Sequence, residues 1–387
     1  MKPSVSLLFA CMLAAPLLAL GITPAAAQQE VKIIDTVELS GPGAPSGTNW
    51  QKGADLAVQE INAAGGILGR KIALTHIDNQ SNPGTAKAVV AKAIDEDPYV
   101  ILGPIFSGDV MVTMAAVDQA EIPQIMGGEA APLTQQGYHY TFRTSLSQSA
   151  AMPKLATYLA GEAGVKTIAV VYVNNDFGKG GHDAMLPELA KRNVKVLADI
   201  STEQGQLDFS NVVVAVQKSG ADALFAYLNE EESARLLIEL RKQGYSKPIY
   251  GETVLISNKV IQLAGAAANG TKGHVGLSAD APNPLIKAFA AKFKKAYGFD
   301  TDHNGIKGYF AVYLVKAITE KIGKFDRKAF AAALRGAHLS TKDYPGLLID
   351  TTFDQKGDID RESYLVEVKD GKQVIIKTLP PLGEAFK

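Results

Sequence analysis

The chain has 387 residues, of which 47% are hydrophobic and 20% are charged, and this composition is typical of a folded globular protein rather than a disordered or membrane-embedded one. The length predicts two domains. The formal net charge of −1 gives no indication of nucleic acid or an anionic membrane as a partner.

Residues 1–27 have the features of a secretory signal peptide: Lys2 supplies a positive start, residues 5–20 are apolar, and small residues end at Ala27. A lipoprotein signal with acylated Cys11 is the alternative, but the apolar stretch ahead of it is short. We expect cleavage near Ala27 and export to the periplasm without a membrane span. Since Cys11 is the only cysteine, the mature chain would have no disulfide or thiolate.

Strand and helix patterns alternate along the chain from Val31 to Gly251, with turn signals between them. This alternation predicts parallel sheets flanked by helices, arranged as two similar units in series. Residues 282–335 are expected to be mostly helical, and the pattern alone does not assign them to either unit. Two or three strands follow, at 347–353, 364–368 and 374–379.

Ligands of open parallel sheets bind beyond the carboxyl ends of the strands, so the loops there are candidate sites. Four such loops stand out, at 40–47, 103–109, 127–130 and 174–178. In the first two, glycines let the backbone approach a ligand, and a serine at a helix start offers donors to a carboxylate. The simpler interpretation of Ser107 alone is a helix N-cap.

Glu252 follows a predicted buried strand and has no lysine or arginine nearby in the sequence. A carboxylate at such a position needs a partner, and a ligand ammonium would be one. The alternative is an exposed loop glutamate.

Catalytic signatures are mostly absent from the sequence: it has no nucleophile elbow, no phosphate-binding loop, no dinucleotide fingerprint and no zinc-protease motif. The six histidines show no metal-ligand spacing. We therefore expect no enzyme, no cofactor and no metal. A hydrolase would need Ser107 and an unidentified histidine.

Several segments together resemble type I periplasmic solute-binding proteins of the leucine/isoleucine/valine-binding family. They are 40–42, 53–57, 60–69, 78–80, 103–107, 131–134, 142–144, 175–178 and 353–358. The resemblance implies an α/β, two-lobed fold in which each lobe is a parallel sheet flanked by helices, joined by a three-strand hinge near 144–147, 276–280 and 347–353. The implied N-terminal lobe is 28–145 plus 279–350, and the C-terminal lobe is 146–278 plus 351–387.

The resemblance also implies a binding site. Ser107 would bind a ligand carboxylate, the Gly128 carbonyl and Glu252 would receive an α-amino group, and Phe177 stands where the family often has tyrosine. Ile105 and Phe106 would line the same loop as Ser107. Three positions depart from the family pattern: Ala130 replaces a threonine that donates to the carboxylate, Ser46 replaces an aromatic residue, and Asn229 replaces a tyrosine.

The function implied is the periplasmic substrate-binding component of an ABC uptake transporter that delivers its ligand to an inner-membrane permease. Amino acids, preferably aliphatic or branched-chain, are the first expectation. An aromatic or other small carboxylate is the alternative, because the absence of the threonine at Ala130 and the rings of Phe106 and Phe177 would tolerate it. An exported hydrolase or a sensor module is less favoured.

Overall fold

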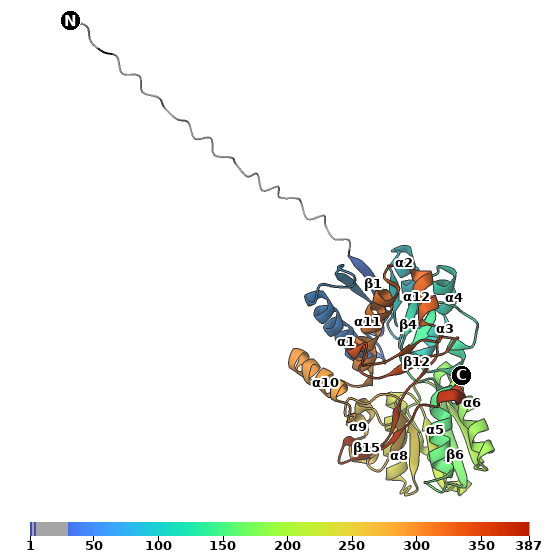
Figure 1. The fold of residues 1–387 in the computed structure, drawn as a ribbon. Helices are drawn as coiled ribbons and strands as arrows, with labels where there is room; N and C mark the ends of the chain where they lie inside the picture. The colour runs from blue at the N-terminus through green and yellow to red at the C-terminus, as the bar shows by residue number, and fades with distance from the viewer. Residues whose placement is uncertain (2–3, 5–29, 387) are drawn as a thin grey trace.

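A computed structural model of the chain describes residues 1, 4 and 30–386, and it shows two lobes stacked end to end (Figure 1). Apart from Met1 and Ser4, the expected signal peptide at 1–27 lies outside the described residues, as does Cys11. Within the described residues, no helix combines the length and the apolar character that crossing a membrane requires.

The N-terminal lobe contains a five-stranded sheet with the order β2-β1-β3-β4-β5, and all neighbouring strands are parallel. Because the strands are parallel, their carboxyl ends meet at one edge, where ligands are expected. The strands are β1 (Val31–Val37), β2 (Ile72–Asp78), β3 (Val100–Leu102), β4 (Gln124–Met126) and β5 (Thr141–Arg143).

Helices cover both faces of this sheet. Ile33 of β1 packs into the core formed with α1 and α11, whereas the next residue, Ile34, packs against α2 and α4 on the other face. The helices of this lobe are α1 (Ala44–Ala63), α2 (Pro83–Asp95), α3 (Ser107–Met111), α4 (Met114–Gln119), α10 (Pro284–Tyr297), α11 (His303–Ile322) and α12 (Arg327–Leu334), with short 3₁₀ turns η1 (Ala131–Thr134) and η3 (Pro345–Leu347).

The helical block that the sequence pattern left unassigned therefore packs on the N-terminal lobe, and α11 lies directly against α1. Glycines permit this close approach. A Cβ atom added at Gly53 would lie 2.0 Å from the Gly305 carbonyl oxygen, and one added at Gly308 would lie 2.1 Å from the carbonyl oxygen of Trp50. This contact fixes α11, whose first turns reach the space between the lobes.

The C-terminal lobe contains a seven-stranded sheet with the order β15-β14-β10-β9-β8-β6-β7. Strands β6 to β10 run parallel, and β14 and β15 are added antiparallel at one edge. The strands are β6 (Thr167–Val173), β7 (Lys195–Thr202), β8 (Ala223–Tyr227), β9 (Ile249–Glu252), β10 (Lys272–Val275), β14 (Ser363–Lys369) and β15 (Lys372–Leu379).

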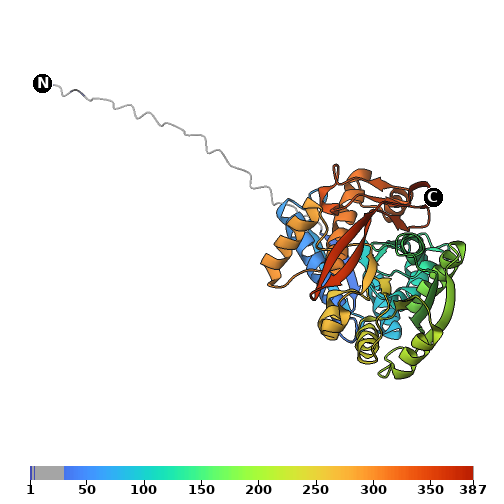
Figure 2. The ribbon, with the colours of Figure 1, turned by 90° about the horizontal axis from the view of Figure 1, so that it is seen from below.

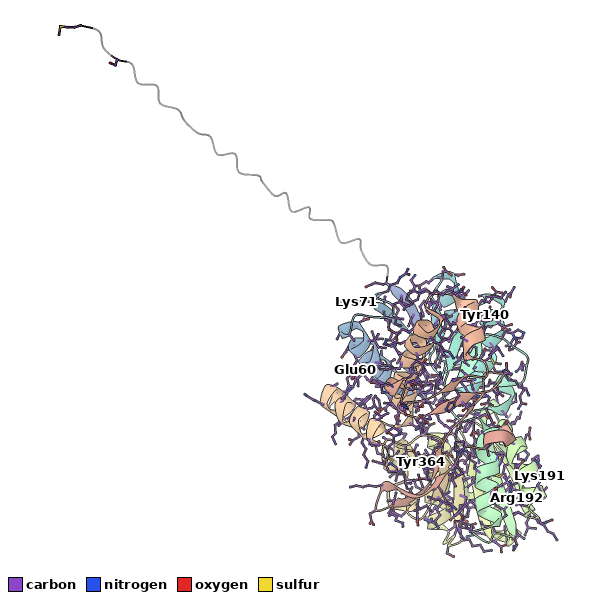
Figure 3. All side chains as sticks on the ribbon, viewed as in Figure 1. Glu60, Lys71, Tyr140, Lys191, Arg192 and Tyr364 are labelled. Carbon is purple, nitrogen blue, oxygen red and sulfur yellow. The ribbon has the colours of Figure 1, made fainter. Side chains whose placement is uncertain are left out.

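Helices again lie on both faces of the sheet, and Figure 2 shows them from below. Val170 of β6 packs with α5 and α6, and its neighbour Val171 packs into the core that includes α7 and α8. The helices are α5 (Gln148–Ala160), α6 (Asp176–Lys191), α7 (Ser210–Ser219), α8 (Glu230–Lys242) and α9 (Asn258–Ala264), with 3₁₀ turns η2 (Gly265–Ala268) and η4 (Gly383–Phe386). Figure 3 shows how densely side chains fill both lobes.

The expected α/β, two-lobed fold with helix-flanked parallel sheets is confirmed. Within residues 30–386 the chain passes between the lobes three times: from β5 to α5, from β10 to α10, and through the short segment between β13 and β14. We expected the third passage near 347–353. Instead, β12 (Thr351–Phe353) and β13 (Ile359–Asp360) form a small antiparallel sheet with β11 (His338–Leu339), and the chain joins the large sheet at Ser363. The lobe boundaries themselves stay a prediction.

The Gly53 contact generates a test of how α11 is positioned. Gly53→Ala should lower the free energy of unfolding by about 1–3 kcal/mol, because the added methyl group would force α1 and α11 apart. Gly84→Ala is the matched control, since Gly84 is exposed in the first turn of α2, where alanine favours the helix. Urea denaturation of both variants measures the difference, and equal effects at the two sites would contradict the packing argument.

Candidate ligand-binding cleft

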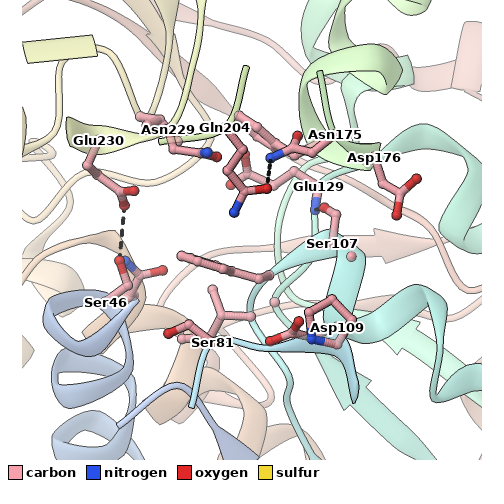
Figure 4. A pocket seen from close by; sticks show the side chains of 18 of the residues that line it. Ser46, Ser81, Ser107, Asp109, Glu129, Asn175, Asp176, Gln204, Asn229 and Glu230 are labelled. Carbon is pink, nitrogen blue, oxygen red and sulfur yellow. Dashed lines mark hydrogen bonds between the residues drawn. The ribbon is translucent and has the colours of Figure 1, made fainter. Parts of the chain in front are cut away.

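A cavity of about 250 Å³ lies between the two lobes, and both lobes line it (Figure 4). The N-terminal lobe contributes residues 105–109 at the end of β3 and the start of α11. The C-terminal lobe contributes the loop into α6, the first residue of α8 and Val254 after β9. The cavity therefore lies at the carboxyl ends of the parallel strands, where the sequence placed it.

The loop after β3 is held in place by contacts with Thr36 and Glu38, at the end of β1. Gly103 has φ of +74°, and a Cβ atom there would lie 2.3 Å from the carbonyl oxygen of Thr36, so only glycine fits without strain. The fully buried carboxylate of Glu38 accepts hydrogen bonds from the backbone N–H groups of Ile105 (3.1 Å) and Phe106 (2.9 Å). The loop is thus fixed before any ligand binds.

Ser107 lies at the wall of the cavity and is only 4% exposed. It is the first residue of α3 rather than an N-cap. Its Oγ accepts hydrogen bonds from the backbone N–H groups of Glu129 (3.2 Å) and Ala130 (3.1 Å). Since a hydroxyl has two acceptor positions and one donor, the O–H of Ser107 is left to donate to a ligand.

Apolar side chains from both lobes form much of the remaining wall. Ile105 and Phe106 line it from the N-terminal lobe, and Phe177 and Val254 line it from the C-terminal lobe. The Phe177 ring stacks on Tyr227, with ring centroids 4.4 Å apart and an interplanar angle of 22°. The cavity is therefore suited to a ligand with an apolar body.

A hydrogen bond joins the lobes across the cavity. Ser46 Oγ donates to Glu230 Oε1 at 3.2 Å, and Figure 4 shows this pair at one end of the pocket, with Ser107 and Asp109 at the other. Ser46 lies inside α1, which begins at Ala44. Asn229 lines the cavity beside Glu230, and burial raises the pKa of Glu230.

Six of the nine residues expected in the site line this cavity: Ser46, Ile105, Phe106, Ser107, Phe177 and Asn229. Gly128 and Ala130 do not line it. Their carbonyl oxygens accept hydrogen bonds from the buried guanidinium of Arg143, at 2.8 Å to Gly128 and 3.1 Å to Ala130. The Arg143 Nε lies 3.0 Å from Asp358, so this cation is itself paired.

Glu252 lines a second, much smaller cavity of about 10 Å³ rather than the large one. Its carboxylate accepts hydrogen bonds from the Thr253 N–H (2.7 Å) and hydroxyl (2.9 Å), and His274 Nδ1 lies 2.9 Å from it. Burial raises the pKa of Glu252 to about 7 and lowers that of His274 to about 3. Glu252 is thus engaged by its own chain.

The sequence interpretation assigned no role to Glu129 or Lys307, which line both cavities and pair at 2.9 Å. Burial raises the pKa of Glu129, although the Lys307 ammonium acts in the opposite direction. Lys307 lies one helical turn before Phe310, on the apolar face of α11. A charged residue on that face was the signal available in the sequence.

Asp109 and Glu38 form a buried acid pair at the Ser107 end of the cavity. Asp109 is 2% exposed, and its Oδ2 has no hydrogen-bond partner among the described residues. Burial, followed by the charge of Glu38, raises the pKa of Asp109 to about 8, and burial raises that of Glu38. A pKa of about 8 favours the protonated form of Asp109 at neutral pH.

Within the described part of the chain, no group of three or more histidine, cysteine, aspartate or glutamate side chains is arranged to hold a metal ion. The arrangement described above can bind a small molecule by one hydroxyl donor, several amide side chains and an apolar wall, and it can enclose that molecule between two lobes.

This fold and cleft define a two-lobed solute-binding protein, and the sequence profile described as "Periplasmic binding protein" matches residues 30–373. The chain belongs to this family. It is 26% identical over 331 residues to "Leu/Ile/Val-binding protein homolog 1" of Brucella melitensis, and the match covers 85% of this chain and 88% of the relative.

Two solved structures share the fold. One is a branched-chain amino acid transporter substrate binding protein of Streptococcus pneumoniae in complex with isoleucine, with a TM-score of 0.81, 24% identity, and coverage of 91% of this chain and 99% of that one. The other is a solute binding protein of R. palustris in complex with benzoate, with a TM-score of 0.82, 22% identity, and coverage of 92% and 98%.

The acid pair generates a prediction about stability. The pKa of Asp109 in the folded chain is raised to about 8 from 3.8, so folding takes up a proton between these values and stability falls as pH rises. Asp109→Asn removes this dependence. The variant should be as stable as the parent near about pH 4 and more stable by a few kcal/mol above about pH 8.

Chemical denaturation across this pH range measures the difference. Asp176→Asn is the matched control, because it makes the same acid-to-amide change at an exposed position of the same cavity. A constant difference between Asp109→Asn and the parent at all pH values would show that Asp109 does not take up a proton on folding.

Proposed function

We propose that this chain is the periplasmic substrate-binding component of an ABC uptake transporter, and that it holds a small carboxylate-bearing ligand between its lobes. The observation that carries the proposal is the cavity between the lobes, in which the O–H of Ser107 is left to donate and apolar side chains from both lobes form part of the wall. Family membership supports the binding role. A binding role, rather than catalysis, also fits a serine hydroxyl whose oxygen is occupied by two backbone amides.

An inner-membrane permease is the proposed partner, since a binding protein of this class delivers its ligand to a membrane component. The predicted signal peptide at 1–27 supports export to the periplasm. Both ligand classes expected from the sequence are represented among proteins of the same fold, one bound to isoleucine and one to benzoate. We therefore consider two candidate classes of ligand: amino acids, and aromatic or other small carboxylates without an amine.

A thermal-shift panel of aliphatic amino acids and aromatic acids tests the proposal. A ligand present at about 100 times its dissociation constant stabilises the folded state by about 2.7 kcal/mol, which raises the melting temperature measurably. The ligand should be recovered intact after denaturation, which argues against an exported hydrolase. Absence of a shift with every member of both classes would contradict the proposed function.

Ser107 is the residue whose substitution should weaken binding most directly. Ser107→Ala removes the hydroxyl that donates to the ligand carboxylate, and a hydrogen bond to a charged group contributes roughly 1.5–3 kcal/mol. We expect the dissociation constant of the best ligand of the panel to rise roughly 10- to 100-fold in calorimetric titration.

Ser257→Ala is the control for Ser107→Ala, since Ser257 is a buried N-cap serine of α9 outside both cavities. It should cost about 1 kcal/mol of stability and leave ligand affinity unchanged. Equal affinity of the parent and Ser107→Ala would remove Ser107 from the site.

A further inference from the structure

We propose that the ligand is an organic acid without an α-ammonium group, because the chain occupies the place of that group with its own cation, the Lys307 ammonium. This inference rests on the proposed function and selects between its two ligand classes. It makes Lys307 the residue that determines specificity.

The position of an α-ammonium group follows from covalent geometry. In an α-amino acid the ammonium and the carboxylate are attached to the same carbon atom, so they bind at neighbouring points. If the ligand carboxylate accepts from Ser107, the ammonium must lie close to Ser107 as well. The loop that contains Glu129 adjoins Ser107, since the Glu129 backbone nitrogen lies 3.2 Å from Ser107 Oγ.

The Glu129 carboxylate is already paired with the Lys307 ammonium. Lys307 Nζ lies 2.9 Å from Glu129 Oε1, and the two side chains are only 4% and 12% exposed. Both residues line the cavity. A ligand ammonium would either displace Lys307, which leaves a buried cation without its partner, or place a second cation on the same Glu129 carboxylate, and both are costly.

The other two groups expected to receive an ammonium are also engaged by the chain. The Gly128 carbonyl accepts from Arg143 and does not line the cavity. The Glu252 carboxylate is bound by Thr253 and His274 and faces the smaller cavity. The three acceptor groups considered for a ligand ammonium are thus present, but each already accepts from, or pairs with, side chains of the protein itself.

The smaller cavity contains as many basic side chains as carboxyl groups without a ligand. Its lining contains the carboxylates Glu129 and Glu252 and the cations Lys307 and Arg361. Arg361 is 1% exposed, and its Nε and Nη1 have no hydrogen-bond partner within the described residues. An additional ammonium would add a third positive charge to two carboxylates, whereas an anionic ligand would not.

The other carboxylates of the large cavity do not provide an alternative site for a ligand ammonium next to Ser107. Glu230 lies at the other end of the pocket, where Ser46 binds it (Figure 4). Asp109 is buried beside Glu38, and burial followed by the charge of Glu38 raises its pKa to about 8, which favours its neutral form. Asp176 is exposed, and an ion pair with an exposed carboxylate contributes little. The cavity near Ser107 thus presents a hydroxyl donor and apolar rings, which suit an aromatic or branched organic acid.

Matched pairs of ligands test the inference on the unaltered protein. Each pair differs only in the α-amino group: leucine against 4-methylpentanoate, phenylalanine against 3-phenylpropanoate, and phenylglycine against phenylacetate. Calorimetric titration should show the amine-free member of the pairs that bind to be roughly 10- to 100-fold tighter.

Two contrary outcomes are distinguishable. Equal or tighter binding of the amino acid overturns this inference and leaves the proposed function intact. Binding of neither member of any pair, together with an empty thermal-shift panel, overturns the proposed function and this inference with it.

Lys307→Met tests the mechanism, because it frees the Glu129 carboxylate for a ligand ammonium without adding a charge. In this variant the preference for the amine-free acid should fall at least about tenfold or reverse. Lys292→Met is the control, since it removes a lysine that pairs with Glu60 at 2.8 Å outside the cavity, and it should keep the parent preference. An unchanged preference in folded Lys307→Met overturns the role of Lys307. The wild-type comparison holds even if this variant does not fold.

Discussion

Glu129 is bound at three points, and the arrangement of the cleft depends on these contacts. Its N–H donates to Ser107, its carbonyl accepts from Gln148 N–H at 2.9 Å, and its carboxylate pairs with Lys307. The residue thus ties the end of β4 to the end of β3, to the start of the C-terminal lobe and to α11. Without the Lys307 ammonium, its buried carboxylate would be uncompensated.

Ligand binding and lobe closure are expected to be coupled, because residues of both lobes line the cavity. Ser107 and Phe106 belong to one lobe and Phe177 to the other, so a ligand that touches all three stabilises the closed arrangement relative to an open one. A ligand shifts such an equilibrium only by its difference in affinity for the two states. The hydrogen bond between Ser46 and Glu230 is a direct contact between the lobes in this structure.

The fold was predictable because its signals are local. Alternating strand and helix patterns identify both sheets, and strand ends identify the loops that contain Ser107 and Phe177. The resemblance implied the third passage near 347–353, whereas it follows β13, which has only two residues, too few to show a periodicity that would have located it. The assignment of α10 to α12 came from the resemblance, and the glycine contacts between α1 and α11 give its physical basis.

The site was predictable only in part, because its charged side chains are paired with residues that are distant in the sequence. Lys307 and Glu129 are 178 positions apart, and Glu38 bonds to Phe106 across 68 positions. Sequence patterns give no register between such segments. Glu252 illustrates the consequence. It was expected just after a strand and is the last residue of β9, but its contacts with Thr253 and His274 and its place at the smaller cavity follow from tertiary packing.

The most direct measurement of the central claim is a crystal structure of the protein with the tightest-binding ligand of the matched pairs. The account predicts a ligand carboxylate within hydrogen-bond distance of Ser107 Oγ, no ligand cation near it, and an intact ion pair between Lys307 and Glu129. A ligand ammonium bound to Glu129, with Lys307 displaced from it, would contradict the account.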